Sequence, residues 1–215
     1  MKNLILKVEG LHVTPLDEIP KKLKKSPSLD FHQHWLSKRE PHFCPGSIVL
    51  GSDSQYLVGH VILTDHFIKN SAKQRGDRTW EMGDVFEIFI KRADQKKYWE
   101  FHITPENFHL SLALPPAEER PDLSIDEFIK CYWRDFEEFE SRVEISPHKN
   151  LWQINWRIPW SIFDIKNPSS VLWQMSFCRY DYSENPNDRP VLSSTSPLTK
   201  PNFHRIQEWL EFEVE

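Results

Sequence analysis

The sequence contains little glycine, little cysteine and none of the short motifs that mark several common classes of enzyme. It has six Gly in 215 residues, and no glycine-rich phosphate loop is present. The HExxH signature of zinc-binding helices and the GxSxG nucleophile elbow are also missing. Catalysis would have to be argued from residue types alone, so we expect a protein that is not an enzyme.

Cysteine and long apolar runs are both scarce. The three cysteines, Cys44, Cys131 and Cys178, are odd in number and widely spaced, which predicts idle thiols rather than a disulfide framework or a CxxC metal site. The first seven residues contain only three consecutive apolar residues, and no later stretch is long enough to span a membrane. These features predict a soluble, cytoplasmic protein.

The chain also lacks a large excess of positive or negative charge. The formal net charge is -5, and acidic and basic residues are mixed along the chain. Phosphate binding needs a basic surface, so nucleic acid is not the expected main partner. The lysine cluster at residues 21–25 is the local exception, and we interpret it as a solvated loop.

Strand periodicity is clearest in residues 80–114, where alternate side chains take opposite faces. Val85, Glu87 and Phe89 share one face of the first strand. Glu87 is therefore a carboxylate between two apolar residues. Such a group is a candidate for a role beyond packing.

The two strands that follow are expected to form a hairpin around a turn at residues 104–107. Burial of one face selects a register that pairs apolar with apolar residues. This register gives an apolar face and a polar face that carries Glu100, His102 and His109. The predicted pairs are Ile103 with Phe108, Phe101 with Leu110, Trp99 with Leu112, His102 with His109, and Glu100 with Ser111.

The rest of the chain repeats the strand pattern without βα alternation. Residues 151–158 are the cleanest strand, residues 4–9 a weak edge strand, residues 124–130 a short helix, and residues 183–200 a long polar loop. The pattern predicts an all-β fold: a two-sheet antiparallel β-sandwich of roughly nine to eleven strands. We expect a single domain over residues 1–215, with residues 1–45 as an irregular segment packed on it.

Nine tryptophans can serve as core or as exposed aromatic platforms. Trp80 stands in a polar loop, where it either contacts a ligand or packs over a sheet edge. Four others lie in apolar rows and are expected in the core: Trp99, Trp152, Trp156 and Trp173.

Five short motifs in order resemble the family 9 carbohydrate-binding modules, in their stand-alone branch. They are WEMGDVFEIFI, YWEFHITPENFHLSL, WRIPWSIF, WQMSFCRYD and PNFHRIQEWLEFE, and the match runs from about residue 47 to the C-terminus. The resemblance implies an immunoglobulin-like or jelly-roll sandwich and sugar recognition without catalysis. It further implies that terminal sugars lie between two aromatic rings, with charged and amide side chains on the hydroxyls.

Carried over by position, the resemblance places Trp80 near the first aromatic wall and Glu87 at an acidic ligand position. The second wall and an amide fall on residues 202–204, where Asn202 is the amide and His204 replaces the second ring. Ser176 stands where the family has an asparagine.

The family resemblance also implies structural calcium. Asp53, Asp65 and Asp84 are the candidate ligands, although no loop shows dense acidic spacing. His32 and His34 are two residues apart, and we interpret them as surface histidines rather than metal ligands.

The residue types support the same function independently. Sugars present flat CH faces and a rim of hydroxyls, so a site needs an aromatic platform and directional donors and acceptors. We expect non-catalytic binding of a saccharide or a polysaccharide end, with neither nucleic acid nor membrane as partner. The candidate residues are Trp80, Glu87, Glu100, His102, Arg179, Asn202 and His204.

Three alternatives stay open. Glu87 and Arg179 each interrupt an apolar row and could form a buried ion pair. The domain could be an interaction domain that has lost sugar binding, which the missing export signal and His204 favour. A glycoside hydrolase could use a pair among Glu81, Glu87 and Glu100, since paired carboxylates cleave glycosides at the right separation.

Overall fold

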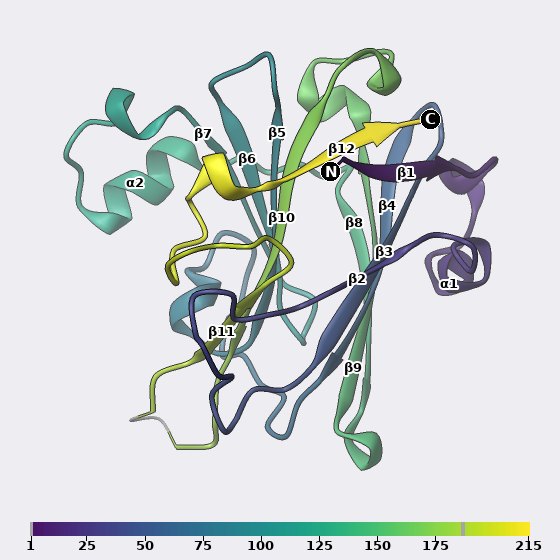
Figure 1. Ribbon diagram of the computed structural model, residues 1–215. Coiled ribbons are helices and arrows are strands. Elements are labelled where there is room, and N and C mark those ends of the chain that lie inside the picture. Colours follow the sequence, from purple (N-terminus) through teal and green to yellow (C-terminus); the bar gives the residue numbers. More distant parts are fainter. Residues whose placement is uncertain (1, 186–187) are drawn as a thin grey trace.

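The computed structural model describes residues 2–185 and 188–215, and this part of the chain is mainly β-strand, as predicted (Figure 1). Its α-helices are α1 (Ile19–Lys22) and α2 (Ile125–Tyr132), and neither has the length and apolar character needed to cross a membrane. The strands are β1 (Asn3–Lys7), β2 (Ser28–Asp30), β3 (Gly46–Ser52), β4 (Tyr56–Thr64), β5 (Val85–Arg92), β6 (Tyr98–Ile103), β7 (His109–Leu114), β8 (Glu140–Ser146), β9 (Leu151–Pro159), β10 (Trp173–Asp181), β11 (Val191–Ser194) and β12 (Leu210–Val214).

The strands form one strongly curled mixed sheet, so the prediction of two separate antiparallel sheets is wrong. The order is β7-β6-β5-β10-β12-β1-β3-β4-β9-β8, with β11 on β10 and β2 on β3. β1 lies between β12 and β3 and runs parallel to both. Residues 4–9 are therefore not an edge strand. The sequence of a short, weakly alternating segment does not indicate which distant strands lie on either side of it.

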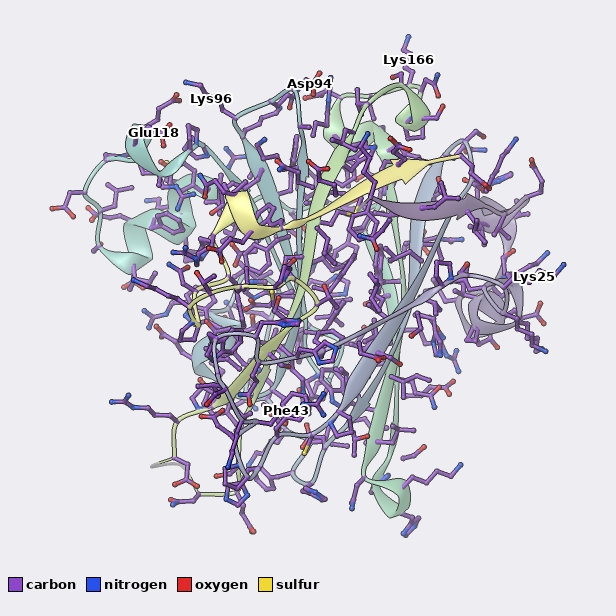
Figure 2. All side chains as sticks on the ribbon, in the orientation of Figure 1. Lys25, Phe43, Asp94, Lys96, Glu118 and Lys166 are labelled. Atoms are coloured by element: carbon purple, nitrogen blue, oxygen red, sulfur yellow. The ribbon has the colours of Figure 1, made fainter. Side chains whose placement is uncertain are left out.

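The two halves of the sheet face each other across the main core (Figure 1). Side chains fill the space between them, and the labelled Lys25, Lys96 and Lys166 point outward from the surface (Figure 2). Burial of large aromatic side chains is the main stabilising contribution here. The four tryptophans predicted for the core are confirmed in it: Trp99, Trp152, Trp156 and Trp173.

The β6–β7 hairpin is shifted by one residue from the predicted register. Thr104 N–H donates to the carbonyl of Phe108 at 3.0 Å, and Asn107 takes a positive φ of 65° that closes a three-residue turn. The pairs are Tyr98 with Leu114, Trp99 with Ala113, Glu100 with Leu112, Phe101 with Ser111, His102 with Leu110, and Ile103 with His109. The prediction assumed that one face stays polar, whereas both faces of this hairpin are buried and mixed.

The face of the sheet that points away from the main core is also buried, and the candidate functional site lies on this face. Phe89, Tyr98, Leu110 and Leu112 lie on the side of the sheet away from the main core, and α2 and residues 198–209 cover them. The predicted helix is confirmed, with Ser124 as its N-cap. Ser124 Oγ accepts from Glu127 N–H, and the Glu127 carboxylate accepts from Ser124 N–H at 3.0 Å.

Two segments expected to be irregular contain regular structure. The loop predicted at residues 183–200 includes β11, which pairs with β10. Within residues 1–45, β1 and β2 join the sheet, and α1 packs through Ile19 against Val58 and Leu11. Both segments are rich in polar residues, so their short strands could not be predicted from the sequence pattern.

Candidate functional site

A cavity of about 660 Å³ opens on the face of β5, β6, β7 and β10 that points away from the main core. The strands supply its floor, and its walls come from a 3-10 turn at Thr79–Glu81, residues 120–128 and residues 201–204. His102 lies beneath the floor, and Arg179 is on the opposite side of the sheet. The other predicted site residues line the cavity: Trp80, Glu87, Glu100, Asn202 and His204.

Three buried ionisable side chains lie together here, Glu87 and Glu100 in the floor and His102 beneath it, and we call them the cavity cluster. Alternation along β6 puts Glu100 and His102 on the same face, and strand pairing sets Glu87 directly opposite His102. His102 Nε2 lies 2.6 Å from Glu100 Oε1 and 3.4 Å from Glu87 Oε1. Its Nδ1 lies 2.7 Å from Thr79 Oγ1. The imidazole is thereby fixed between a hydroxyl and two carboxyl groups.

One oxygen of Glu100 has unused hydrogen-bonding capacity. Oε1 is engaged by His102, but no hydrogen-bond donor among the described residues reaches Oε2, although this atom is buried. His204 Nδ1 lies 4.0 Å from it. A buried carboxylate oxygen without a partner is costly, so such atoms are normally satisfied by a further donor. Because Glu100 lines the cavity, a ligand hydroxyl can supply that donor.

The two carboxyl groups of the cavity cluster differ in their protonation. Burial raises the pKa of Glu87 to about 8; the positive charge of His102 opposes this shift, and the negative charge of Glu100 reinforces it. Burial also opposes ionisation of Glu100, but its hydrogen bond to His102 and the nearby positive charges outweigh burial and lower its pKa. At neutral pH the floor therefore offers a protonated Glu87 as donor and an ionised Glu100 as acceptor.

The charge of His102 follows from the same contacts. Burial disfavours its imidazolium form, but Glu87 and Glu100 outweigh burial and raise the pKa of His102. This shift favours the imidazolium form, and the N–H at Nε2 donates to Glu100 and holds this carboxylate in place.

Trp80 forms one wall of the cavity and is half-buried. Its ring lies edge-on to His102, with 5.7 Å between centroids and an interplanar angle of 76°. Its carbonyl accepts a hydrogen bond from the Tyr182 hydroxyl at 2.6 Å. Trp80 is anchored but not sealed within the core, as a stacking platform requires.

The opposite wall is built by residues 201–204. The side chain of His204 is 46% exposed, and its Nδ1 lies 2.7 Å from the Tyr98 hydroxyl. Its ring stands edge-on to Phe89 with 5.3 Å between centroids. Asn202 Oδ1 accepts from the His204 backbone N–H at 3.0 Å. Asn202 thus shapes the wall on which His204 is presented.

A further wall residue, Arg120, was not predicted from the sequence. Its guanidinium donates to the Tyr98 hydroxyl at 2.6 Å and to the Pro115 carbonyl at 3.0 Å, and it lies over the ring of Phe128. The capping box at Ser124 signals a helix nearby. It does not indicate which strands that helix covers, so it could not place Arg120.

Arg179 lies outside the cavity, which corrects its predicted role. It faces away from Glu87, because the register of β5 and β10 pairs Glu87 with Cys178. The alternative of a Glu87–Arg179 ion pair is therefore also wrong. Arg179 Nη2 instead lies 2.7 Å from Asp65 Oδ2 and 3.3 Å from Asp181 Oδ2.

Arg179 belongs to a second buried group with Asp65, Asp84 and Asp181, which we call the arginine cluster. Both oxygens of Asp84 accept backbone N–H groups, from Lys69 and Tyr182, each at 2.7 Å. Calcium takes six to eight oxygen ligands, whereas this cluster already holds a guanidinium and fixed N–H donors. The residues present do not fit calcium.

The third calcium candidate, Asp53, lies elsewhere and serves a turn. Its oxygens accept from the backbone N–H groups of His12, Gln55 and Tyr56. These bonds account for Asp53 without a metal.

A second cavity, of about 580 Å³, opens beside the arginine cluster, with Asp65 and Asp181 in its lining. The described residues that line it include no tryptophan. It therefore lacks the large aromatic platform that Trp80 gives the first cavity.

Comparison by sequence gives no match, either to a protein-family model or to a curated protein. Solved structures with the same fold exist. A candidate carbohydrate-binding protein from Bacteroides uniformis ATCC 8492 matches with a TM-score of 0.78 at 15% identity, over 100% of this chain and 99% of that chain.

Two structures of a family 9 carbohydrate-binding module from Caldicellulosiruptor kristjanssonii also match. The complex with cellotriose has a TM-score of 0.64 at 12% identity, over 100% of this chain and 94% of that one. The complex with glucose has a TM-score of 0.65 at 12% identity, over 99% and 96%. The chain shares the fold of these modules over its full length, and the sequence resemblance predicted this fold from about residue 47 to the C-terminus.

Proposed function

We propose that this chain binds a saccharide, without catalysis, in the cavity above the cavity cluster. The observation that carries the proposal is the unpaired, buried oxygen of Glu100 on a cavity floor walled by Trp80. A hydroxyl-rich ligand with apolar faces suits both features. The shared fold with modules solved in complex with cellotriose and glucose supports the same class of ligand.

Each residue has a separate role in this proposal. Trp80 stacks on a sugar face, and Glu100 Oε2 accepts from a hydroxyl. Protonated Glu87 donates to a second oxygen, and His204 closes the opposite wall. His102 does not line the cavity; it holds the Glu100 carboxylate in position.

The proposal is tested by a glycan-array screen followed by calorimetric titration with the best saccharide. Trp80→Ala should weaken binding roughly 10-fold or more, because an aromatic contact contributes about 1 kcal/mol or more beyond its buried area. Trp133→Ala is the matched control, since Trp133 is exposed and lines a different cavity. Unchanged affinity in Trp80→Ala would exclude this site, and no bound glycan at all would favour the interaction-domain alternative.

Of the three carboxylates that the sequence offers a glycoside hydrolase, only two line the cavity. Glu81 is exposed, lies 3.3 Å from Arg78 and lines another cavity, which leaves Glu87 and Glu100. We expect no release of reducing ends from polysaccharides. Time-dependent release that disappears in Glu87→Gln would instead establish a glycosidase.

A further inference from the structure

We propose that the cavity cluster is a binding site for a divalent transition-metal ion, with Zn²⁺ as its best match. The ligands are His102 Nε2 and one oxygen each from Glu87 and Glu100. This inference goes beyond saccharide binding and does not depend on it, because the protein alone supplies these ligands.

The donor atoms are of the right kind and lie together. The candidate ligand atoms of the three residues are all within 4.8 Å of one another. One imidazole nitrogen with carboxylate oxygens suits Zn²⁺ and its transition-metal neighbours better than Ca²⁺ or Mg²⁺, which prefer oxygen alone.

The spacing is close to that of a coordination shell. Two ligands of a tetrahedral Zn²⁺ ion are roughly 3.3 Å apart when each bond is about 2.0 Å. His102 Nε2 and Glu87 Oε1 already lie 3.4 Å apart. The 2.6 Å separation of Nε2 and Glu100 Oε1 must open by roughly 0.7 Å. On binding, the ion displaces two protons, the one that joins this pair and the one on Glu87, and both leave to solvent.

His102 is held in the orientation that such a site needs. Its Nδ1 lies 2.7 Å from Thr79 Oγ1, so this hydroxyl can accept from Nδ1–H and leave Nε2 as the ligand nitrogen. Histidines that bind metals characteristically carry a hydrogen-bond partner on the second ring nitrogen. Strand pairing and this hydroxyl fix the ring without any ion.

A second observation points to a ligand at the same place. Glu100 is 5% exposed, and among the described residues its Oε2 has no hydrogen-bond partner. The free oxygen allows the carboxylate to turn toward an ion without breaking another bond. Because Glu87 and Glu100 line the cavity, a further coordination position faces the opening.

The inference is tested by calorimetric titration of the chelator-stripped protein with ZnCl₂ in the absence of saccharide. We expect one ion per chain, and binding roughly 100-fold weaker in His102→Gln and in Glu100→Gln. Two variants are used because a substitution at a buried position can perturb folding, which circular dichroism checks. Co²⁺ added to the wild type should give the visible absorption of a bound, low-coordinate ion, and the same variants should lose it.

Two histidine controls separate this site from others. His109→Gln changes a buried histidine on the other face of the same hairpin and should leave the affinity within about 2-fold. His34→Gln removes a ring 5.0 Å from that of His32, a pair that could bind zinc at the surface. Binding lost in His34→Gln and kept in His102→Gln would overturn the inference, as would no binding to the wild type. Neither result would affect the glycan-array test.

Discussion

The described residues include two buried groups of carboxyl side chains, and these groups differ in the cation that balances their charge. In the arginine cluster the cation is part of the chain: Arg179 lies 2.7 Å from Asp65 and 3.3 Å from Asp181. In the cavity cluster the counter-charge is a histidine, and one oxygen of Glu100 has no partner among the described residues. Both clusters are buried and acidic, and Asp181 Oδ2 of the arginine cluster also makes no hydrogen bond to the described residues. The clusters differ in that Arg179 supplies a fixed cation to one, and in that Glu100 lines the cavity with the tryptophan wall.

This difference separates a structural contact from a binding site. A fixed guanidinium supplies the counter-charge of its carboxylates permanently, and removing it leaves buried charges unpaired. A carboxylate with an open lone pair on a cavity floor gains a partner only when a ligand arrives. The arginine cluster should therefore determine stability, and the cavity cluster should determine affinity.

The largest expected effect is on stability. Arg179→Ala should lower the free energy of unfolding by about 3–5 kcal/mol, because Asp65 and Asp181 would stay buried without their cation. Urea denaturation measures this change, with Glu100→Gln as the comparison from the cavity cluster. A loss below about 1 kcal/mol would show that the arginine cluster is not a structural contact.

The next effect is on affinity. Glu100→Gln keeps the shape of the side chain but removes its charge, so saccharide affinity should fall roughly 10- to 100-fold. Asp181→Asn, in the arginine cluster, should leave the affinity within about 2-fold. Calorimetric titration with the saccharide selected on the array measures both. Equal losses of saccharide affinity in the two variants would contradict the assignment of binding to the cavity cluster alone.

A pH effect on stability comes next. Burial raises the pKa of Asp84 to about 8, reinforced by the charge of Asp65. Burial raises the pKa of Asp181 to about 7, against the charge of Arg179. The folded state then holds more protons than the unfolded state between about pH 4 and pH 8. The contribution of these groups to the free energy of unfolding is therefore largest at acid pH and falls as the pH rises toward 8.

Asp181→Asn isolates this contribution. Urea denaturation from pH 5 to pH 8 should show a smaller fall in stability for this variant than for the wild type, since one titrating group is gone. An unchanged or steeper fall would contradict the assignment of a raised pKa to Asp181.

The smallest effect is expected from removing calcium. The arginine cluster carries its own cation, and Asp53 is satisfied by backbone N–H groups. A calcium-selective chelator should leave the melting temperature within about 1 °C. A clear rise in the melting temperature on adding Ca²⁺ would contradict this expectation.

Local patterns predicted much of the cavity cluster. Alternation put Glu100 and His102 on one face of a strand, and the apolar neighbours of Glu87 marked it as unusual. The family resemblance brought Trp80, Asn202 and His204 to the same place. These residues could be predicted because strand periodicity is local and the motif order fixes which loops meet.

The arginine cluster could not be assembled from sequence. Asp65 follows β4, and Arg179 lies in β10, so their contact depends on the packing of the two halves of the sheet. Asp181 did carry a signal, because it lies two residues from Arg179 and so on the same face. The hairpin register was missed because Asn107 adopts a positive φ that the sequence permits but does not require.

The most direct test of saccharide binding at the cavity cluster is the change in intrinsic tryptophan fluorescence on adding the saccharide selected by the array. The wild type and Trp133→Phe should show the same saturable change, and Trp80→Phe should not, because Trp80 is the tryptophan in the cavity wall. A change that persists in Trp80→Phe at the same affinity would place the saccharide elsewhere and contradict the account.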